Sequence, residues 1–230
     1  MATEEAAAEL IAEIEQRLTI LAGSLPESVS VAALGVRQKA PYKALALREA
    51  LIWRSEEIAR GALQMLKQGD FASAIVLSRA VIECTAMMAR LAKEVLERRN
   101  ASAEQLDDTL MKLLLGWKMP GEGETPAAIN ILTLIDQLDK RIGGGVRHAY
   151  DLMSEFAHPN WSGVTSLFAR TDREAYVTYF GRMREGEKAL AVTILSALAG
   201  CLALFELDYN AVADALPAWL AELDSLGPAE

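Results

Sequence analysis

Two charged residues interrupt an apolar stretch at positions 71–89, and they are the first candidates for chemistry. Arg79 and Glu83 are four positions apart, so on a helix they lie on one face and within reach of each other. Their neighbours are mostly apolar, which predicts a helix deep in a bundle, where a buried ion needs a partner. We expect an internal ion pair that fixes the helix register. The alternative is a polar pocket in which Arg79 holds an anion and Glu83 orients it.

A second candidate lies in YDLMSEFAHPNWSG at 150–163, which contains one of the two histidines of the chain. His158 precedes Pro159, so we expect the helix to stop there, and the negative end of the helix dipole favours a charged histidine. A helical wheel places one polar arc opposite the apolar side: Arg147, Tyr150, Asp151, Ser154, Glu155 and His158. Such an arc is typical of a solvated face. Its mixture of residue types also suits a binding pocket, for which we expect these residues: Arg79, Glu83, Tyr150, Ser154 and His158.

Motifs for metals and cofactors are missing from the sequence. Cys84 and Cys201 lie in apolar helical patterns without a CxxC pair, so we expect two buried thiols and no zinc site. Glu155 and His158 have the ExxH spacing of di-metal bundles, but a single copy cannot build that site. No GxSxG, P-loop or GxGxxG sequence appears in a suitable context. We therefore expect no metal and no cofactor.

The elements that must position these residues are mostly helices. A 230-residue chain that is 52% hydrophobic can form one large core, so we expect a single helical-bundle domain over 1–230. It divides into an N-terminal helix at 1–23, a linker at 24–40 and a bundle core at 41–225. Periodicity and breakers predict the helices at 3–23, 41–68, 71–98, 103–117, 126–141, 146–157, 185–208 and 209–225, with Asp70 as an N-cap.

One interval differs from the helical pattern. VTSLFAR at 164–170 and AYVTYFG at 175–181 are rich in β-branched and aromatic residues around a polar connection, which predicts a small β-hairpin that leans on the helices. The following helix contains seventeen uncharged residues, ALAVTILSALAGCLALF. The run is short for a membrane span and contains polar residues. We expect a fully buried central helix, so the fold class is mainly all-α with one hairpin.

Charge limits the partners. The chain has 32 acidic and 23 basic residues, a net charge of −9, which makes nucleic acid an unfavourable partner. The N-terminus is acidic and amphipathic rather than a signal peptide, so we expect a cytoplasmic protein that does not bind membranes. Several helices are apolar over more than half their circumference, which favours a homodimer.

The pattern RxxxE at Arg79 and Glu83, followed by YxxxSxxxHP from Tyr150 to Pro159, resembles a family of bacterial helical proteins of unknown function that are distantly HEPN-like. The resemblance covers about 45–205. It implies an α-helical bundle, often dimeric, with ribonucleases of toxin–antitoxin and anti-phage systems among its relatives.

The sequence departs from the nuclease pattern, which has an arginine and a histidine four to six residues apart on one helix. Arg147 precedes His158 by eleven positions, and the pair Arg141 and His148 straddles GGG. If RNA were cleaved, His158 would handle the proton of the ribose hydroxyl or the leaving oxygen, and Arg79 or Arg147 would stabilise the phosphorus intermediate. We expect a non-enzymatic binding or regulatory module with a small ligand or protein partner, and keep a HEPN-type ribonuclease as the alternative.

Overall fold

The computed structural model describes residues 2–30, 32–35, 38–118, 125–182 and 187–225. Within these ranges the chain is mainly α-helical, with one two-stranded antiparallel sheet. The predicted fold class is therefore confirmed.

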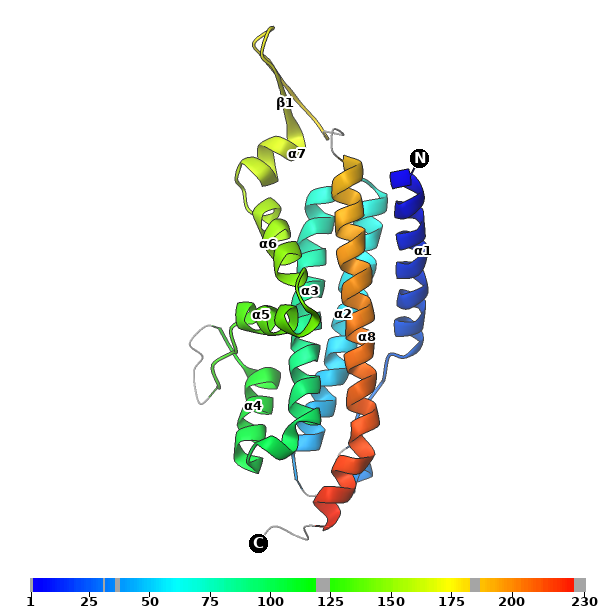
Figure 1. Cartoon of the computed structure of the whole chain (residues 1–230), viewed down its shortest axis with the longest axis vertical. Helices are drawn as coiled ribbons and strands as arrows, with labels where there is room; N and C mark the ends of the chain where they lie inside the picture. Colours follow the sequence, from blue (N-terminus) through cyan, green and yellow to red (C-terminus); the bar gives the residue numbers. More distant parts are fainter. Residues whose placement is uncertain (1, 31, 36–37, 119–124, 183–186, 226–230) are drawn as a thin grey trace.

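Four long helices form the body of the molecule: α1 (Ala2–Gly23), α2 (Ala40–Lys67), α3 (Phe71–Leu96) and α8 (Glu187–Ser225). Helices α2 and α8 both pack along α3, and α1 packs against α8 and α2 (Figure 1). The first three lie where periodicity predicted them, within one or two residues. The described residues of the predicted linker between α1 and α2 form one short helical turn, η1 (Ala32–Leu34), and are otherwise irregular.

Three shorter helices cover the other side of α3: α4 (Ala103–Leu115), α5 (Ile131–Ile142) and α6 (Val146–Ala157), with η2 (Arg98–Asn100) leading into α4. Helices α5 and α6 pack on α3, whereas α4 packs mainly on α2 (Figure 1). Ser102 begins α4 with a capping box. Gly143 ends α5 in the left-handed conformation, at φ 88°, where a glycine avoids a steric penalty.

The helix predicted over 126–141 begins five residues later than expected. Asn130 caps it through a hydrogen bond from the Leu132 N–H, and residues 125–129 are not helical. Ala127 forms a parallel bridge with Trp117, which also ends α4 at Leu115 rather than at 117. A tertiary backbone pairing therefore replaced the last and first turns of the two predicted helices.

The helices predicted at 185–208 and 209–225 are one helix, α8, which continues through Pro217. No glycine or proline lies between Phe205 and Pro217, so the helix does not break there. The acidic Asp208 is buried and pairs with Arg141 at 2.6 Å. The prediction of a fully buried helix is also wrong. Ile194, Leu198 and Phe205 face the core, but Thr193 and Gly200 lie on an exposed side.

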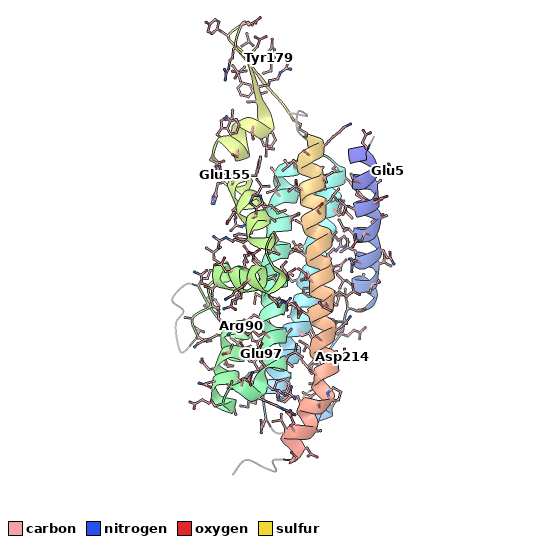
Figure 2. All side chains as sticks on the ribbon, viewed as in Figure 1. Glu5, Arg90, Glu97, Glu155, Tyr179 and Asp214 are labelled. Carbon is pink, nitrogen blue, oxygen red and sulfur yellow. The ribbon has the colours of Figure 1, made fainter. Side chains whose placement is uncertain are left out.

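The hairpin exists, although it is shorter and placed differently from the prediction. Residues 161–168 are helical, as η3 (Trp161–Thr165, a π-helix) and α7 (Ser166–Phe168), and the strands are β1 (Ala169–Asp172) and β2 (Val177–Phe180). The hairpin does not lean on the helices. It projects beyond the end of the bundle, with Tyr179 far from the core (Figures 1 and 2). Its side chains are therefore almost entirely exposed.

Two local predictions have mixed outcomes. Both cysteines are buried free thiols, as expected. Asp70 occupies the N-cap position of α3, but its side chain makes no capping hydrogen bond and instead pairs with Arg182 at 2.7 Å. Helices α3 and α8 are long and apolar enough to cross a membrane by length and composition, but 50% and 39% of their most apolar windows are buried inside the bundle.

Candidate functional site

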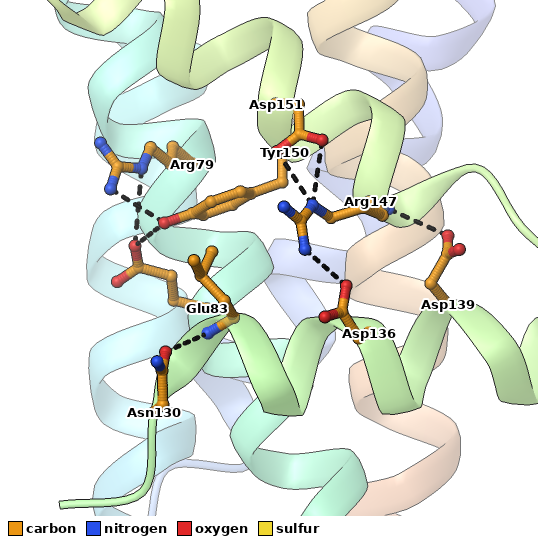
Figure 3. Close-up of polar contacts among 9 residues, drawn as sticks. Arg79, Glu83, Asn130, Asp136, Asp139, Arg147, Tyr150 and Asp151 are labelled. Atoms are coloured by element: carbon orange, nitrogen blue, oxygen red, sulfur yellow. Dashed lines mark hydrogen bonds and ion pairs between the residues drawn. The ribbon is translucent and has the colours of Figure 1, made fainter.

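Tyr150 joins the two charged residues of α3 (Figure 3). Its hydroxyl accepts a hydrogen bond from Arg79 Nη2 at 2.8 Å and donates one to Glu83 Oε1 at 3.0 Å. Arg79 Nε lies 3.6 Å from the same carboxylate oxygen, and the guanidinium carbon is 4.9 Å from the centroid of the Tyr150 ring. One tyrosine from α6 therefore orders both members of the ion pair.

The cluster is less buried than the sequence predicted. The Arg79 and Glu83 side chains each keep 31% of their surface exposed, whereas Tyr150 keeps 3%. Helix α6 turns Val146, Tyr150 and Met153 toward α3, so its polar arc is not uniformly solvated. The predicted internal ion pair is therefore only half-buried, and Tyr150 covers it.

Arg147 is held by acids on both sides (Figure 3). Its guanidinium contacts Asp151 at 2.9 Å and Asp136 at 2.5 Å, and its backbone N–H donates to Asp139. Asp151 and Asp136 raise the pKa of Arg147 and keep it cationic. This network connects α6 to α5, so the Arg147 guanidinium is used in contacts within the fold.

The remaining predicted site residues lie further along α6. Ser154 is one turn beyond Tyr150, and its buried Oγ has no hydrogen-bond partner within the described part of the chain. His158 ends the helix as predicted, in an extended conformation, but it is exposed. Eight residues of helix separate it from Tyr150, about 12 Å along the axis. The structure brings together Arg79, Glu83 and Tyr150, and it does not bring His158 to them.

A pocket of about 220 Å³ opens beside Glu83, between α2, α3, α4 and α5. Glu83 therefore belongs both to the tyrosine cluster and to the pocket wall. The wall is otherwise largely apolar, and its lining includes Met87, Leu113, Ala128, Ile129, Ile131 and Leu134.

Three cations line the same pocket: Arg54 from α2, Lys112 from α4 and Lys118 from the chain after α4. Lys112 pairs with Asp108 at 2.6 Å. Within the described ranges no ion pair joins Arg54 or Lys118 to a carboxylate. The site is thus locally cationic in a chain whose net charge is −9.

The Cys84 thiol also lines the pocket. Burial raises its pKa, and the nearby Arg54 guanidinium acts in the opposite direction by favouring the thiolate. Burial is the larger effect, so the thiol is neutral at physiological pH. Cys84 is therefore part of the wall rather than a nucleophile.

Gly116 allows the pocket to close at one end. A Cβ atom there would lie 2.3 Å from the Lys112 carbonyl oxygen and 2.7 Å from the Ala128 Cα. The close approach lets the Trp117 N–H donate to the Pro126 carbonyl, and the Ala128 N–H to the Trp117 carbonyl, each at 3.0 Å. These bonds hold Ala128 and Ile129 against the pocket.

Sequence reasoning missed Arg54, Lys112 and Lys118. Each is an unremarkable surface charge in its own segment, and only tertiary packing places the three around one cavity. Among the described residues no cluster of histidine, cysteine and acidic side chains could hold a metal ion. Comparisons with family models, with curated proteins and with solved structures found no match.

Proposed function

We propose that the chain is a non-enzymatic binding module whose pocket beside Glu83 takes a small organic carboxylate with a short alkyl chain. The observation that carries this proposal is the convergence of Arg54, Lys112 and Lys118 on an apolar pocket in an acidic chain. Ligand pockets typically combine apolar walls with a few polar groups that fix orientation.

The ligand class follows from the two parts of the pocket. Apolar side chains such as Leu113 and Ile131 favour an alkyl group, because burying it removes apolar surface from water. The Arg54 guanidinium binds a carboxylate with paired hydrogen bonds, and Lys118 adds a positive charge. Glu83 adds a negative charge, which disfavours ligands that carry more than one negative charge.

Hexanoate is a suitable probe, and hexanamide is the neutral control of the same shape. Isothermal titration calorimetry should detect hexanoate binding to the wild-type chain and weaker binding of the amide. Arg54→Gln and Lys118→Gln should each weaken hexanoate binding by about tenfold, which corresponds to the loss of one charge-assisted hydrogen bond. Arg60→Gln removes an exposed arginine of the same helix that pairs with Glu56 and does not line this pocket. Once circular dichroism shows that this variant is folded, it should bind hexanoate like wild type.

Equal affinity for hexanoate and hexanamide, or equal affinity of Arg54→Gln and Arg60→Gln, would contradict the proposal. Phosphate titration separates a general anion site from a carboxylate site. We expect weaker binding of phosphate than of hexanoate, because phosphate cannot use the apolar wall.

The ribonuclease alternative has less geometric support. Arg147 and His158 lie at opposite ends of α6, about 16 Å apart along the axis for eleven residues of helix. Arg79 is hydrogen-bonded to Tyr150. We therefore expect no cleavage of single-stranded RNA. Cleavage that is lost in both His158→Ala and Arg79→Ala, with both variants folded, would favour the nuclease instead.

A further inference from the structure

The hairpin presents aromatic side chains to solvent at one end of the molecule (Figure 2). Tyr176 is 93% exposed, Phe180 81% and Tyr179 49%. Monomeric proteins rarely leave such a concentration of large apolar residues uncovered. The exposed aromatic residues therefore indicate a binding surface. The chemistry of the two strand edges indicates which partner binds there.

Hydrogen bonding inside the hairpin defines those edges. The Gly181 N–H donates to the Phe168 carbonyl, and the register pairs Arg170 with Tyr179 and Thr171 with Thr178. Bonded and non-bonded pairs alternate along an antiparallel ladder, so Arg170 and Tyr179 bond to each other. The backbone groups of Thr171 and Thr178 therefore point away from each other, toward the two free edges.

The two edges differ in chemistry. The β1 strand carries Arg170 and Asp172, and charged residues on an edge strand prevent further strands from adding to it. The β2 strand, with the sequence Val-Thr-Tyr-Phe, has no charge and is exposed at every residue. An exposed apolar edge of this kind is a template for pairing with another strand.

We propose that β2 pairs with β2 of a second copy of the chain, antiparallel and about a two-fold axis at Thr178. The two hairpins then form a four-stranded sheet. Thr178 exchanges backbone hydrogen bonds with its symmetry mate, and Val177 lies opposite Tyr179 of the other copy, a favourable β-branched and aromatic pair. The register also brings Tyr176 near Phe180 of the other copy. The charged β1 strands lie at the outer edges, so assembly stops at a dimer.

The exposed aromatic area that two copies can offer is close to the area of a small specific interface. The exposed fractions of Tyr176, Tyr179 and Phe180 together equal a little more than two whole aromatic side chains. At about 200 Å² for each, that is roughly 450 Å² per protomer and about 900 Å² for the pair. This is the largest aromatic area that the pair can bury, and strand pairing covers the part that faces the neighbouring strand. A specific interface requires about 1,000 Å², so the backbone groups of the paired β2 strands must also contribute.

A pair of proline variants tests the edge. Thr171 and Thr178 face each other, their hydroxyls are 3.1 Å apart, and neither uses its backbone N–H inside the hairpin. Thr178→Pro removes the N–H that bonds to the second copy, whereas Thr171→Pro removes one from the outer edge. By light scattering and sedimentation equilibrium, wild type and Thr171→Pro should be dimers. The dissociation constant of the Thr178→Pro dimer should be at least about tenfold higher than that of wild type, because two backbone hydrogen bonds across the two-fold axis are lost.

Charged variants test the register. Position 177 lies opposite Asp172 in the hairpin, and position 179 lies opposite Arg170. Val177→Lys and Tyr179→Glu therefore each place a charge opposite a residue of the other sign, which keeps the hairpin itself stable. Each alone should be monomeric, because it places a charge against an apolar residue of the other copy. An equimolar mixture should form a heterodimer, since the new lysine then lies opposite the new glutamate.

Several outcomes would overturn the proposal. One is a wild-type chain that is monomeric at all concentrations; another is a dimer that Thr178→Pro and Thr171→Pro affect equally. A mixture of the charged variants that stays monomeric would also exclude this pairing. Binding of the monomer to neutral phosphatidylcholine vesicles, lost in Tyr176→Ser, would assign the aromatic surface to a membrane instead. Circular dichroism should show the same helix content in all variants, because the hairpin lies outside the bundle.

Discussion

At the scale of single residues, Tyr150 connects the two charged residues of α3 in the candidate site. It is buried, and its ring centroid lies 4.9 Å from the guanidinium carbon of Arg79. Its hydroxyl accepts a hydrogen bond from Arg79 and donates one to Glu83. A hydroxyl that is hydrogen-bonded to two half-buried ions orders both, because it replaces part of the hydration that each ion loses on burial. Glu83, which also lines the pocket, is thereby held in place.

Tyr150→Phe removes only this hydroxyl. We expect the free energy of unfolding to fall by about 1 kcal/mol, less than for a fully buried charged pair, because water reaches Arg79 and Glu83 once the hydroxyl is gone. Urea denaturation measures the change, and Tyr42→Phe on α2 is the matched control, because its hydroxyl makes no hydrogen bond within the described residues. An unchanged unfolding midpoint in Tyr150→Phe would show that the cluster is solvated and unordered.

At the scale of elements, the connection between α4 and α5 decides whether the pocket exists. The Trp117–Ala127 bridge brings the start of α5 to the end of α4, and Gly116 makes that approach possible because it has no side chain. The same bridge places Ala128 and Ile129 in the pocket wall.

Gly116→Ala should lower the free energy of unfolding by about 1–3 kcal/mol, because the added methyl overlaps backbone atoms that have to move. Binding of hexanoate should weaken in parallel. Gly200→Ala is the control: its Cβ meets nothing within 4 Å, and alanine in place of a helical glycine should raise stability by about 0.5–1 kcal/mol. Thermal and urea unfolding of both variants test this. Equal stability of Gly116→Ala and wild type would contradict the role given to Gly116.

At the scale of the whole molecule, burial in the core changes the titration of groups far from the pocket. Cys201 on α8 is 4% exposed, and burial raises the pKa of its thiol from 9.0 to about 12. In the unfolded chain the thiol ionises near pH 9, whereas in the folded chain it stays neutral. The folded state therefore holds the proton more tightly, and this contribution to stability is complete below pH 9 and is lost as the pH rises toward 12.

Stability should accordingly fall between pH 9 and 12, and Cys201 should contribute a slope of up to about 1.4 kcal/mol per pH unit. Cys201→Ala should be less stable at pH 7 because of the lost packing, but its stability should decline less steeply with pH. Thr193→Ala, exposed on the same helix, should keep the wild-type slope. Urea unfolding at a series of pH values measures both, and parallel curves for wild type and Cys201→Ala would contradict the assignment.

The sequence by itself determined the long helices and part of the site. Periodic apolar residues placed α1, α2 and α3, and the spacing of Arg79 and Glu83 predicted an ion pair on one face of α3, because these signals depend only on helix geometry. The end of α6 at His158 followed from the steric effect of Pro159. Each of these features is local, so neighbouring residues were sufficient to predict it.

Only the tertiary structure decided the features that join distant segments. Arg54, Lys112 and Lys118 share a pocket because four helices pack together, and Trp117 pairs with Ala127 in place of two predicted helical turns. The tertiary structure likewise made α8 one helix and turned the hairpin away from the bundle, leaving its aromatic side chains exposed. Burial and pairing between distant segments depend on where the chain returns in space, and local periodicity carries no information about that.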